Sequence, residues 1–150
     1  MEYLQITITS FQQLTLHKLY DILQLRSEIF VVEQNCVYND LDGYDQKAYH
    51  LIMELDKRTI GTARILPGGS RFAQVSIGRV VVHKEFRSRN YGKLLMKQAI
   101  EYAREKWNDP EIKISAQLYL KKFYEDLGFK TVSEVYDEDG IPHIGMILSP

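Results

Sequence analysis

The sequence predicts a mixed α/β fold in which helices cover a sheet whose first strands are largely antiparallel. Segments with alternating apolar and polar residues are interspersed with segments whose apolar residues recur at helical spacing. Clusters of Gly, Pro, Asn and Asp separate these segments, as expected for turns. With 150 residues, 45% hydrophobic content and no internal repeat, the chain is expected to form a single domain over residues 1–150.

The first half of the chain predicts one strand, one helix and a strand hairpin. Alternation predicts a strand at residues 3–9, and Thr15 is placed to cap the helix that follows. The apolar positions of that helix are Leu16, Leu19, Leu23 and Phe30. Polar and acidic residues 35–46 predict a loop. Two strands then follow, joined by a turn at residues 56–58, and they span residues 47–55 and 59–66.

The second half predicts a long strand, a long helix and a C-terminal hairpin. A turn at residues 67–70 precedes the strand at residues 73–82. An amphipathic helix is expected from about Asn90 to Trp107, with Pro110 beyond its end. The remaining elements are a strand at residues 112–116, a short helix at residues 117–127 closed by Gly128, and a hairpin of residues 130–136 and 141–148.

The junction between the long strand and the long helix indicates an anion site. A basic turn containing Gly92 opens the helix, where several backbone N–H groups lack helical partners and the helix dipole adds positive charge. Such a site suits a phosphate. The sequence lacks a Walker A loop, and the turn lacks the three glycines of a dinucleotide fingerprint. What remains is Arg87-x-x-Asn90-x-Gly92, a pattern that many surface turns share.

A second segment, residues 117–129, narrows the interpretation of the Arg87-x-x-Asn90-x-Gly92 pattern. Residues 117–129 contain Phe123-Tyr124-x-x-x-Gly128-Phe129, and they follow the strand–turn–helix by about thirty residues. The two segments, in this order, resemble the GNAT N-acetyltransferase superfamily. Residues 26–34 and 137–146 further resemble its ElaA-like subfamily. The resemblance implies a GNAT acyl-CoA acyltransferase fold, with a mixed and mostly antiparallel sheet of six to seven strands flanked by about four helices.

The resemblance implies acetyl-CoA as co-substrate and assigns the residues that would bind it. In that family the basic turn wraps the pyrophosphate of coenzyme A, and the preceding strand can pair with the pantetheine arm. The implied binding residues are Val80, Val81, Val82, Arg87, Ser88, Arg89, Asn90, Tyr91, Gly92, Lys93 and Gln117. Asn90 departs from the usual glycine, although Asn tolerates left-handed backbone angles better than most residues.

Tyr124 is the candidate catalytic residue. When an amine attacks an acetyl thioester, the departing thiolate gains from a nearby proton donor, and a phenol with a pKa of about 10 stays protonated at neutral pH. The alternative role for Tyr124 is packing of the short helix onto the sheet. No activated nucleophile is evident, because Cys36 has no His partner in the sequence, so direct attack in a ternary complex is expected.

Acidic residues after the first helix are candidates for the acceptor side. In GNAT proteins this region helps to form the acceptor cleft, and carboxylates there would attract a cationic amine, although they also suit a solvated loop. These candidates are Glu33, Asp40, Asp42 and Asp45. Arg79 lies in an otherwise apolar strand and needs a partner, for which one of these carboxylates is the natural choice. His50 and His143 are expected to be core histidines.

Two other functions remain open. Arg26, Phe30, Asp42, Asp45 and Arg64 also resemble the acyl-homoserine lactone synthases, which share the fold and use an acyl-carrier protein and S-adenosylmethionine. The chain is short for that family, and Cys36 falls near the place of a usual tryptophan, so this function ranks below acetyl transfer. The other alternative is a non-catalytic acetyl-CoA sensor, against which Tyr124 argues because a pure binder needs no proton donor.

Composition limits the partners and the location. A net charge of −1 disfavours extended nucleic-acid binding, and no apolar run reaches membrane-spanning length. Residues 1–9 lack the features of a signal peptide, and Cys36, the only cysteine, excludes an internal disulfide and a cysteine-based zinc site. The expectation is a cytoplasmic monomer or homodimer that uses no metal and acts on acetyl-CoA and an amine-bearing acceptor.

Overall fold

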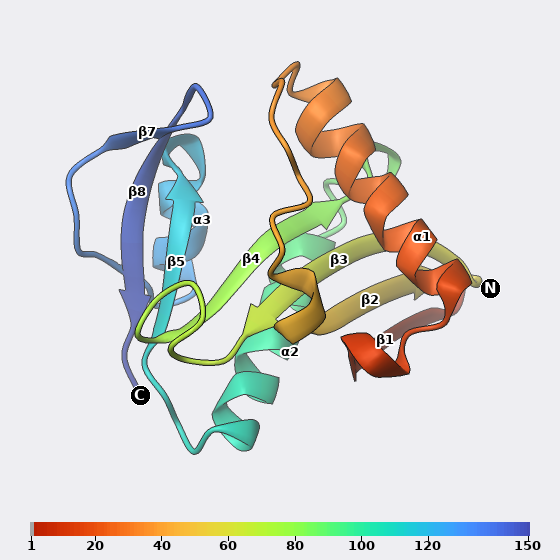
Figure 1. The fold of residues 1–150 in the computed structure, drawn as a ribbon, viewed down its shortest axis with the longest axis horizontal. Coiled ribbons are helices and arrows are strands. Elements are labelled where there is room, and N and C mark those ends of the chain that lie inside the picture. Colours follow the sequence, from red (N-terminus) through yellow and green to blue (C-terminus); the bar gives the residue numbers. More distant parts are fainter. Residues whose placement is uncertain (1) are drawn as a thin grey trace.

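The computed structural model describes residues 2–150 and is built around one mixed sheet of eight strands (Figure 1). The sheet order is β1-β2-β3-β4-β5-β8-β6, and β7 pairs separately with β8. All neighbours are antiparallel except β4 and β5. The strands are β1 Leu4–Ser10, β2 Tyr49–Leu55, β3 Arg58–Leu66, β4 Val75–Val82, β5 Ile112–Gln117, β6 Lys130–Thr131, β7 Tyr136–Glu138 and β8 Ile141–Leu148.

Two tight turns set the register of the hairpins. Leu55 pairs with Arg58, so Asp56 and Lys57 alone make the β2–β3 turn, with φ of 48° and 71°. The β7–β8 hairpin closes in the same way on Asp139-Gly140, with φ of 54° and 81°. Two consecutive positive φ angles are typical of the hairpin turn whose twist matches that of the strands.

The helices lie on both faces of the sheet. α1 Leu16–Arg26 crosses one face, in contact with β3 and β4, and Thr15 caps it by accepting a hydrogen bond from the Lys18 amide. α2 Tyr91–Lys106 and α3 Lys121–Asp126 cover the other face (Figure 1). The main core lies between that face and α2, and its largest members include Leu51, Ile65, Leu95, Met96 and Ile112. No helix in residues 2–150 is long and apolar enough to span a membrane.

The fold class and the mostly antiparallel sheet are confirmed, and several element boundaries differ from the prediction. The predicted strand 130–136 is two short strands, β6 and β7, because residues 132–135 leave the sheet between them; this raises the strand number to eight. Within residues 2–150 there are three α-helices, not four. The predicted helix 117–127 begins only at Lys121, since Gln117 still pairs with β8 and a 3₁₀ turn follows it.

The first helix also departs from its prediction. After Arg26 the chain widens into a π-helical turn, Ser27–Glu33, which rotates the faces that follow it. The predicted apolar stripe is wrong at Leu16, which is 86% exposed. The buried positions of this segment are instead Ile22, Leu25, Arg26 and Ile29.

The sheet is split at its centre. β4 and β5 run parallel and pair only through Val75–Ile112 and Ser76–Lys113, after which they separate. Figure 1 shows β4 leaning away from β5, which continues beside β8. Beyond Ser76, β4 therefore has one edge that no strand pairs with in the described residues. An unpaired strand edge exposes backbone N–H and C=O groups to whatever enters the gap.

A β-bulge reshapes this free edge. Thr62 of β3 faces Val81, whereas Arg64 faces Gly78, so β4 inserts one extra residue between them. Arg79, at this point, has a φ of 48°, an unusual angle for a side chain of its size. The bulge directs Val81 onto α1 and the π-helical turn, where it packs with Leu25 and Ile29.

Candidate active site

A groove of about 740 Å³ begins where the two halves of the sheet separate. Its walls come from β4, the start of α2, α3 and the π-helical turn after α1. It gathers all but one of the residues predicted to bind acetyl-CoA, namely Val80, Val81, Val82, Arg87, Ser88, Asn90, Tyr91, Gly92, Lys93 and Gln117. The candidate catalytic Tyr124 and the predicted acceptor-side Glu33 also line it.

Backbone amides concentrate at the α2 end of the groove. Asn90 precedes α2 with a φ of 60° and makes no side-chain capping bond, so the first-turn N–H groups are left without a cap. Ser88 also has a left-handed φ, 71°, while Arg89 between them does not. Alternating handedness of this kind turns successive N–H groups into one concavity that suits an anion. The irregular Asn90 therefore preserves the geometry that a glycine would provide.

The two arginines of the turn have different surroundings. Arg87 forms a bidentate ion pair with Glu33, with Nη1–Oε1 and Nη2–Oε2 distances of 3.0 and 2.7 Å. Its Nε donates a hydrogen bond to the Val82 carbonyl. The hydrogen bonds from Arg87 lower the pKa of Glu33. Arg89 lies outside the groove lining, where its Nη1 is 3.2 Å from Glu2 and its guanidinium covers Phe86.

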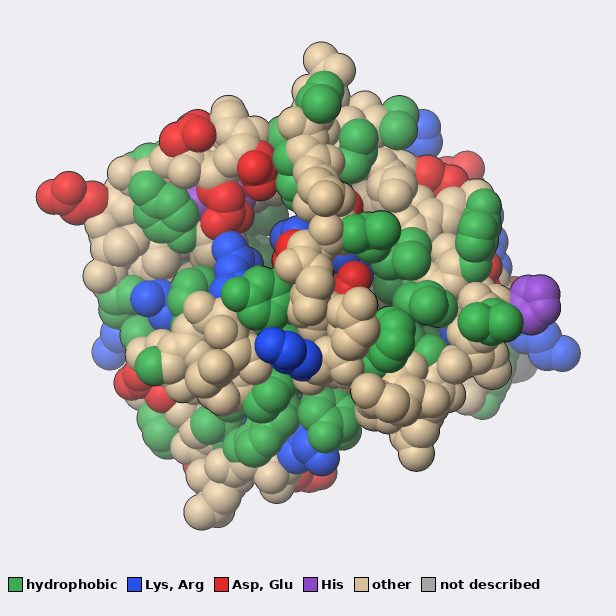
Figure 2. Space-filling view, in the orientation of Figure 1, with side chains coloured by type: hydrophobic (Ala, Val, Ile, Leu, Met, Phe, Trp, Pro, Cys, Tyr) green, Lys and Arg blue, Asp and Glu red, His purple; other side chains and the backbone are tan. Residues whose placement is uncertain are grey.

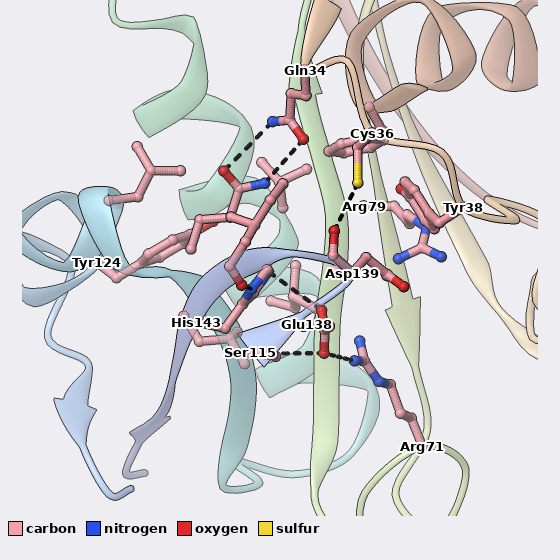
Figure 3. A pocket seen from close by; sticks show the side chains of 18 residues that line it. Gln34, Cys36, Tyr38, Arg71, Arg79, Ser115, Tyr124, Glu138, Asp139 and His143 are labelled. Atoms are coloured by element: carbon pink, nitrogen blue, oxygen red, sulfur yellow. Dashed lines mark hydrogen bonds and ion pairs between the residues drawn. The ribbon is translucent and has the colours of Figure 1, made fainter. Parts of the chain in front are cut away.

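An amide pair crosses the gap in the sheet. Gln34, just after the π-helical turn, and Gln117, at the end of β5, donate to each other's side-chain oxygens at 3.5 and 3.4 Å. Figure 3 shows the Gln34 side chain with the dashed lines that mark these two hydrogen bonds. Gln117 was predicted as a binding residue, whereas its partner Gln34 was not. Both line the groove, so their amides are within reach of a polar chain that enters it.

Tyr124 is buried at the junction of the groove and a second pocket. Its ring is 8% exposed and packs edge-on against Phe123 and Phe129. Burial raises its pKa to about 12, with a smaller contribution from Tyr119, so the phenol is protonated at neutral pH. No group within residues 2–150 makes a hydrogen bond to its hydroxyl. A protonated phenol that lines two cavities is suited to donate a proton between them.

The second pocket, of about 90 Å³, shares Tyr124 with the groove (Figure 3). It lies between the free part of β4, the β5–β8 pair and residues 34–38. Its polar lining consists of Gln34, Cys36, Tyr38, Arg71, Arg79, Ser115, Gln117, Glu138, Asp139 and His143. Cys36 donates its thiol hydrogen to the Asp139 carbonyl at 2.9 Å, which ties residue 36 to the β7–β8 turn.

The predicted acidic residues after Glu33 form an ion network in which Asp40 and Asp45 are buried and Asp42 reaches the surface. Arg26 bonds Asp40 and Asp45 at 2.9 and 2.8 Å, and Arg64 bonds Asp42 at 2.8 Å. Arg79 pairs with Asp40 and Asp42 at 2.8 and 3.2 Å, which confirms that it has a carboxylate partner. Figure 2 shows red and blue side chains gathered around a hollow near the centre of this face. The three arginines balance the charges of the three carboxylates, which suits structural support of the β4 bulge, although Nε of Arg64 and Nε of Arg79 make no hydrogen bond within residues 2–150.

The network also shifts the pKa values of the titratable groups within it and beside it. Burial opposes ionisation of Asp42 and Asp45, but bonds and charges from Arg64 and Arg26 outweigh it and lower both pKa values. Burial lowers the pKa of His50, whose Nε2 lies 2.9 Å from the Asp45 carbonyl. His50 is therefore a buried core histidine, as predicted, and it lies apart from both cavities.

Comparison with known proteins identifies this architecture. The family model described as "Acetyltransferase (GNAT) domain" matches residues 20–150. The chain belongs to the GNAT acetyltransferase family. It is 42% identical to protein ElaA of Escherichia coli over 136 residues, which are 89% of each chain. It is also 38% identical to a UPF0039 protein of Schizosaccharomyces pombe over 150 residues, 99% of each chain.

Solved GNAT structures agree with the fold over almost the whole chain. An acyl-CoA N-acyltransferase from Pseudomonas aeruginosa superposes with a TM-score of 0.92 at 41% identity, covering 98% of this chain and all of that one. Escherichia coli ElaA gives the same TM-score and coverage at 38% identity. The acyl-homoserine lactone synthase LasI, at 12% identity and a TM-score of 0.81, shares the fold alone.

Several features of the site have little or no local signal in the sequence. The β-bulge has one sequence signal, because Gly78 inside a strand pattern suggests a bulge, yet the long strand was predicted as regular. Gln34 and Glu138 join the pockets only through tertiary structure, and nothing local distinguishes them from other exposed polar residues. Among residues 2–150 no group of three or more His, Cys, Asp or Glu side chains is arranged to hold a metal ion.

Proposed function

We infer that this GNAT protein transfers an acetyl group from acetyl-CoA to an amine, by direct attack of the amine on the thioester. The observation that carries this inference is the position of Tyr124, which lines both the 740 Å³ groove and the smaller polar pocket. One cavity suits the donor and the other the acceptor, and a proton donor lies where their reacting groups would meet.

The groove suits the two chemical parts of coenzyme A. The uncapped amides of Tyr91, Gly92 and Lys93, with the nearby Arg87, suit the pyrophosphate. The unpaired edge of β4 from Ile77 to Val82 suits the amide-rich pantetheine arm, which can add to it as a strand would. The apolar side chains of Phe30, Leu120 and Phe123 in the same lining suit the methylene groups of that arm.

The reaction requires a proton at sulfur and stabilisation at oxygen. As the amine attacks, charge develops on the carbonyl oxygen, and a free N–H of the β4 edge can stabilise it. The Tyr124 phenol can then protonate the departing thiolate, since its raised pKa keeps it in the acid form. Cys36 has no role as a nucleophile here, because its thiol is buried and donates to the Asp139 carbonyl.

A pair of measurements tests this function. The first is calorimetric titration of acetyl-CoA, and the second is release of free coenzyme A thiol with a panel of small amines, amino-acid derivatives and peptides. We expect Tyr124→Phe to bind acetyl-CoA nearly as the wild type does and to lower kcat by about 10²-fold. Binding without turnover on any amine would favour a sensor, and failure to bind would exclude both functions.

A further inference from the structure

The second pocket, of about 90 Å³, is called the acceptor pocket below. A chain of polar groups crosses it from Arg71 to His143 (Figure 3). Arg71 Nη2 donates to Glu138 Oε1 at 2.8 Å, and Ser115 Oγ donates to the same oxygen at 3.3 Å. The other oxygen, Oε2, lies 3.3 Å from His143 Nε2. His143 Nδ1 lies 2.7 Å from the Ile141 carbonyl. The chain therefore links three strands and the β3–β4 loop within one pocket.

The hydrogen-bond partners fix where protons can lie. A backbone carbonyl only accepts, so Nδ1 of His143 must carry the hydrogen that bonds Ile141. In the neutral imidazole, Nε2 then carries a lone pair and no hydrogen. It faces Oε2 of Glu138, a carboxylate oxygen that also has only lone pairs. The space between Nε2 and Oε2 thus accommodates one additional proton, which would relieve the opposition of the two lone pairs.

We propose that Glu138 is the general base that takes a proton from the acceptor amine, and that His143 is the positioning residue that receives this proton from it. The proposal rests on the proposed acetyl transfer. Glu138 lines the acceptor pocket together with Tyr124, so proton acceptor and proton donor share one cavity. Arg71 and Ser115 hold Oε1, which leaves Oε2 to act between substrate and His143.

The surroundings of the pair are polar on several sides. Tyr136 stacks on the His143 ring at 6.2 Å, and its hydroxyl bonds Ser115. The charged or titratable groups that face the pair or line its pocket are Arg71 from the β3–β4 loop, Tyr136 from β7, Asp139 from the β7–β8 turn, Tyr124 from α3, and Cys36, Tyr38 and Arg79 from the opposite wall. Within residues 2–150, only Arg71 forms an ion pair with Glu138 besides His143.

Acetyl transfer removes two protons from the acceptor nitrogen in this proposal. An acceptor ammonium gives one proton to Glu138 Oε2, which passes it to His143 Nε2, and the neutral amine nitrogen then forms a bond to the thioester carbonyl carbon. The tetrahedral adduct collapses, the carbon–sulfur bond breaks with its electron pair on sulfur, and the thiolate takes the Tyr124 proton. The remaining extra proton on nitrogen returns to the Tyr124 oxygen through solvent, and the proton on His143 leaves to water. The net products are an amide, coenzyme A thiol and one proton.

Rate measurements over a range of pH test the base. We expect Glu138→Gln to lower kcat/KM about 10²-fold at neutral pH and to flatten the fall in rate at acidic pH, with acetyl-CoA binding unchanged. Glu138→Asp keeps the carboxylate and should keep that acidic fall at a reduced rate. Glu134→Gln is the matched control, because Glu134 is exposed and lies outside the pocket. This substitution changes the net charge of the protein by the same amount as Glu138→Gln.

His143→Gln separates a proton relay from simple packing. Without the imidazole, Glu138 holds the proton alone, so the acidic fall in kcat/KM should move to lower pH. If His143 only packs, its loss should lower the rate or the unfolding temperature and leave the pH of the acidic fall in kcat/KM unchanged. If the wild type transfers acetyl groups and Glu138→Gln keeps the full acidic fall and rate, the base assignment is overturned. If the wild type transfers to no amine, the proposed function fails and the assignment fails with it.

Nitrogen NMR of the histidine rings tests the geometry independently of turnover. We expect neutral His143 to be protonated at Nδ1 and bare at Nε2, and the Nε2 signal to change on titration in the wild type. Glu138→Gln should change the Nε2 chemical shift of the His143 ring, whereas Glu134→Gln should not. Finding the Nε2–H tautomer in the neutral ring would contradict the relay even in an enzyme that transfers acetyl groups.

Discussion

The ion pair between Glu33 and Arg87 makes a testable prediction about donor binding. Both side chains line the groove, and their two-pronged contact occupies the guanidinium that a pyrophosphate would use. Glu33→Gln removes both the competing partner and a negative charge beside the phosphate site. Exposed ion pairs contribute about 0.2–1 kcal/mol, and the two short contacts put this pair near the upper end of that range. We therefore expect acetyl-CoA to bind up to about fivefold more tightly.

Calorimetry at two salt concentrations is the assay for this prediction. The gain should be largest at low ionic strength and should shrink near 1 M salt, where the screening length is about 3 Å. Glu28→Gln is the matched control, since Glu28 lies exposed on the same π-helical turn but outside the groove. Equal affinities for the two variants, or weaker binding by Glu33→Gln, would refute the idea that Glu33 competes for Arg87.

Three further predictions concern stability and the anion turn. Arg26→Ala strands two buried carboxylates and should lower the free energy of unfolding by about 3–5 kcal/mol in urea titrations; a loss below about 1 kcal/mol would contradict the buried network. The free energy of unfolding should fall as the pH drops below 6.5, because His50 binds a proton more readily in the unfolded chain than in the folded protein. It should fall again below about 3.8, because Asp45 is also protonated more readily in the unfolded chain. Thermal melts whose midpoints do not change across either range would contradict this. Asn90→Gly should keep or improve acetyl-CoA affinity, while Asn90→Val, a β-branched residue at a φ of 60°, should weaken it and destabilise the fold by about 1–3 kcal/mol; equal calorimetric affinities would show that the left-handed turn is dispensable.

Local patterns in the sequence account for most of the fold. The caps, turns and periodicities around Thr15, Asp56-Lys57 and Gly128 act within a few residues, so they are legible without tertiary structure. The splitting of β4 from β5 is different, because it depends on a parallel pair that stops after two residues. No local pattern encodes where such a pairing ends.

The candidate site divides in the same way. The basic turn and Tyr124 belong to contiguous motifs, and the groove brings these motifs together. Asp40 and Asp42 were predicted to attract an amine, but their carboxylates are paired with arginines that lie 14 to 39 residues away in the sequence. Glu138 faces His143 only because a two-residue turn folds β7 back on β8. Pairings of this kind depend on long-range packing, which composition and spacing do not reveal.

The central inference is that the groove binds the pyrophosphate of acetyl-CoA at the start of α2, and calorimetric titration of Gly92→Glu tests it most directly. A Cβ at Gly92 would meet only Phe123, at an ordinary contact distance of 3.8 Å, and a carboxylate in the first turn of a helix is favourable. We expect the wild type to bind one equivalent of acetyl-CoA and Gly92→Glu to bind none, with an unfolding temperature equal to or above that of the wild type. Equal affinity of the two proteins, or no binding by the wild type, would contradict the inference.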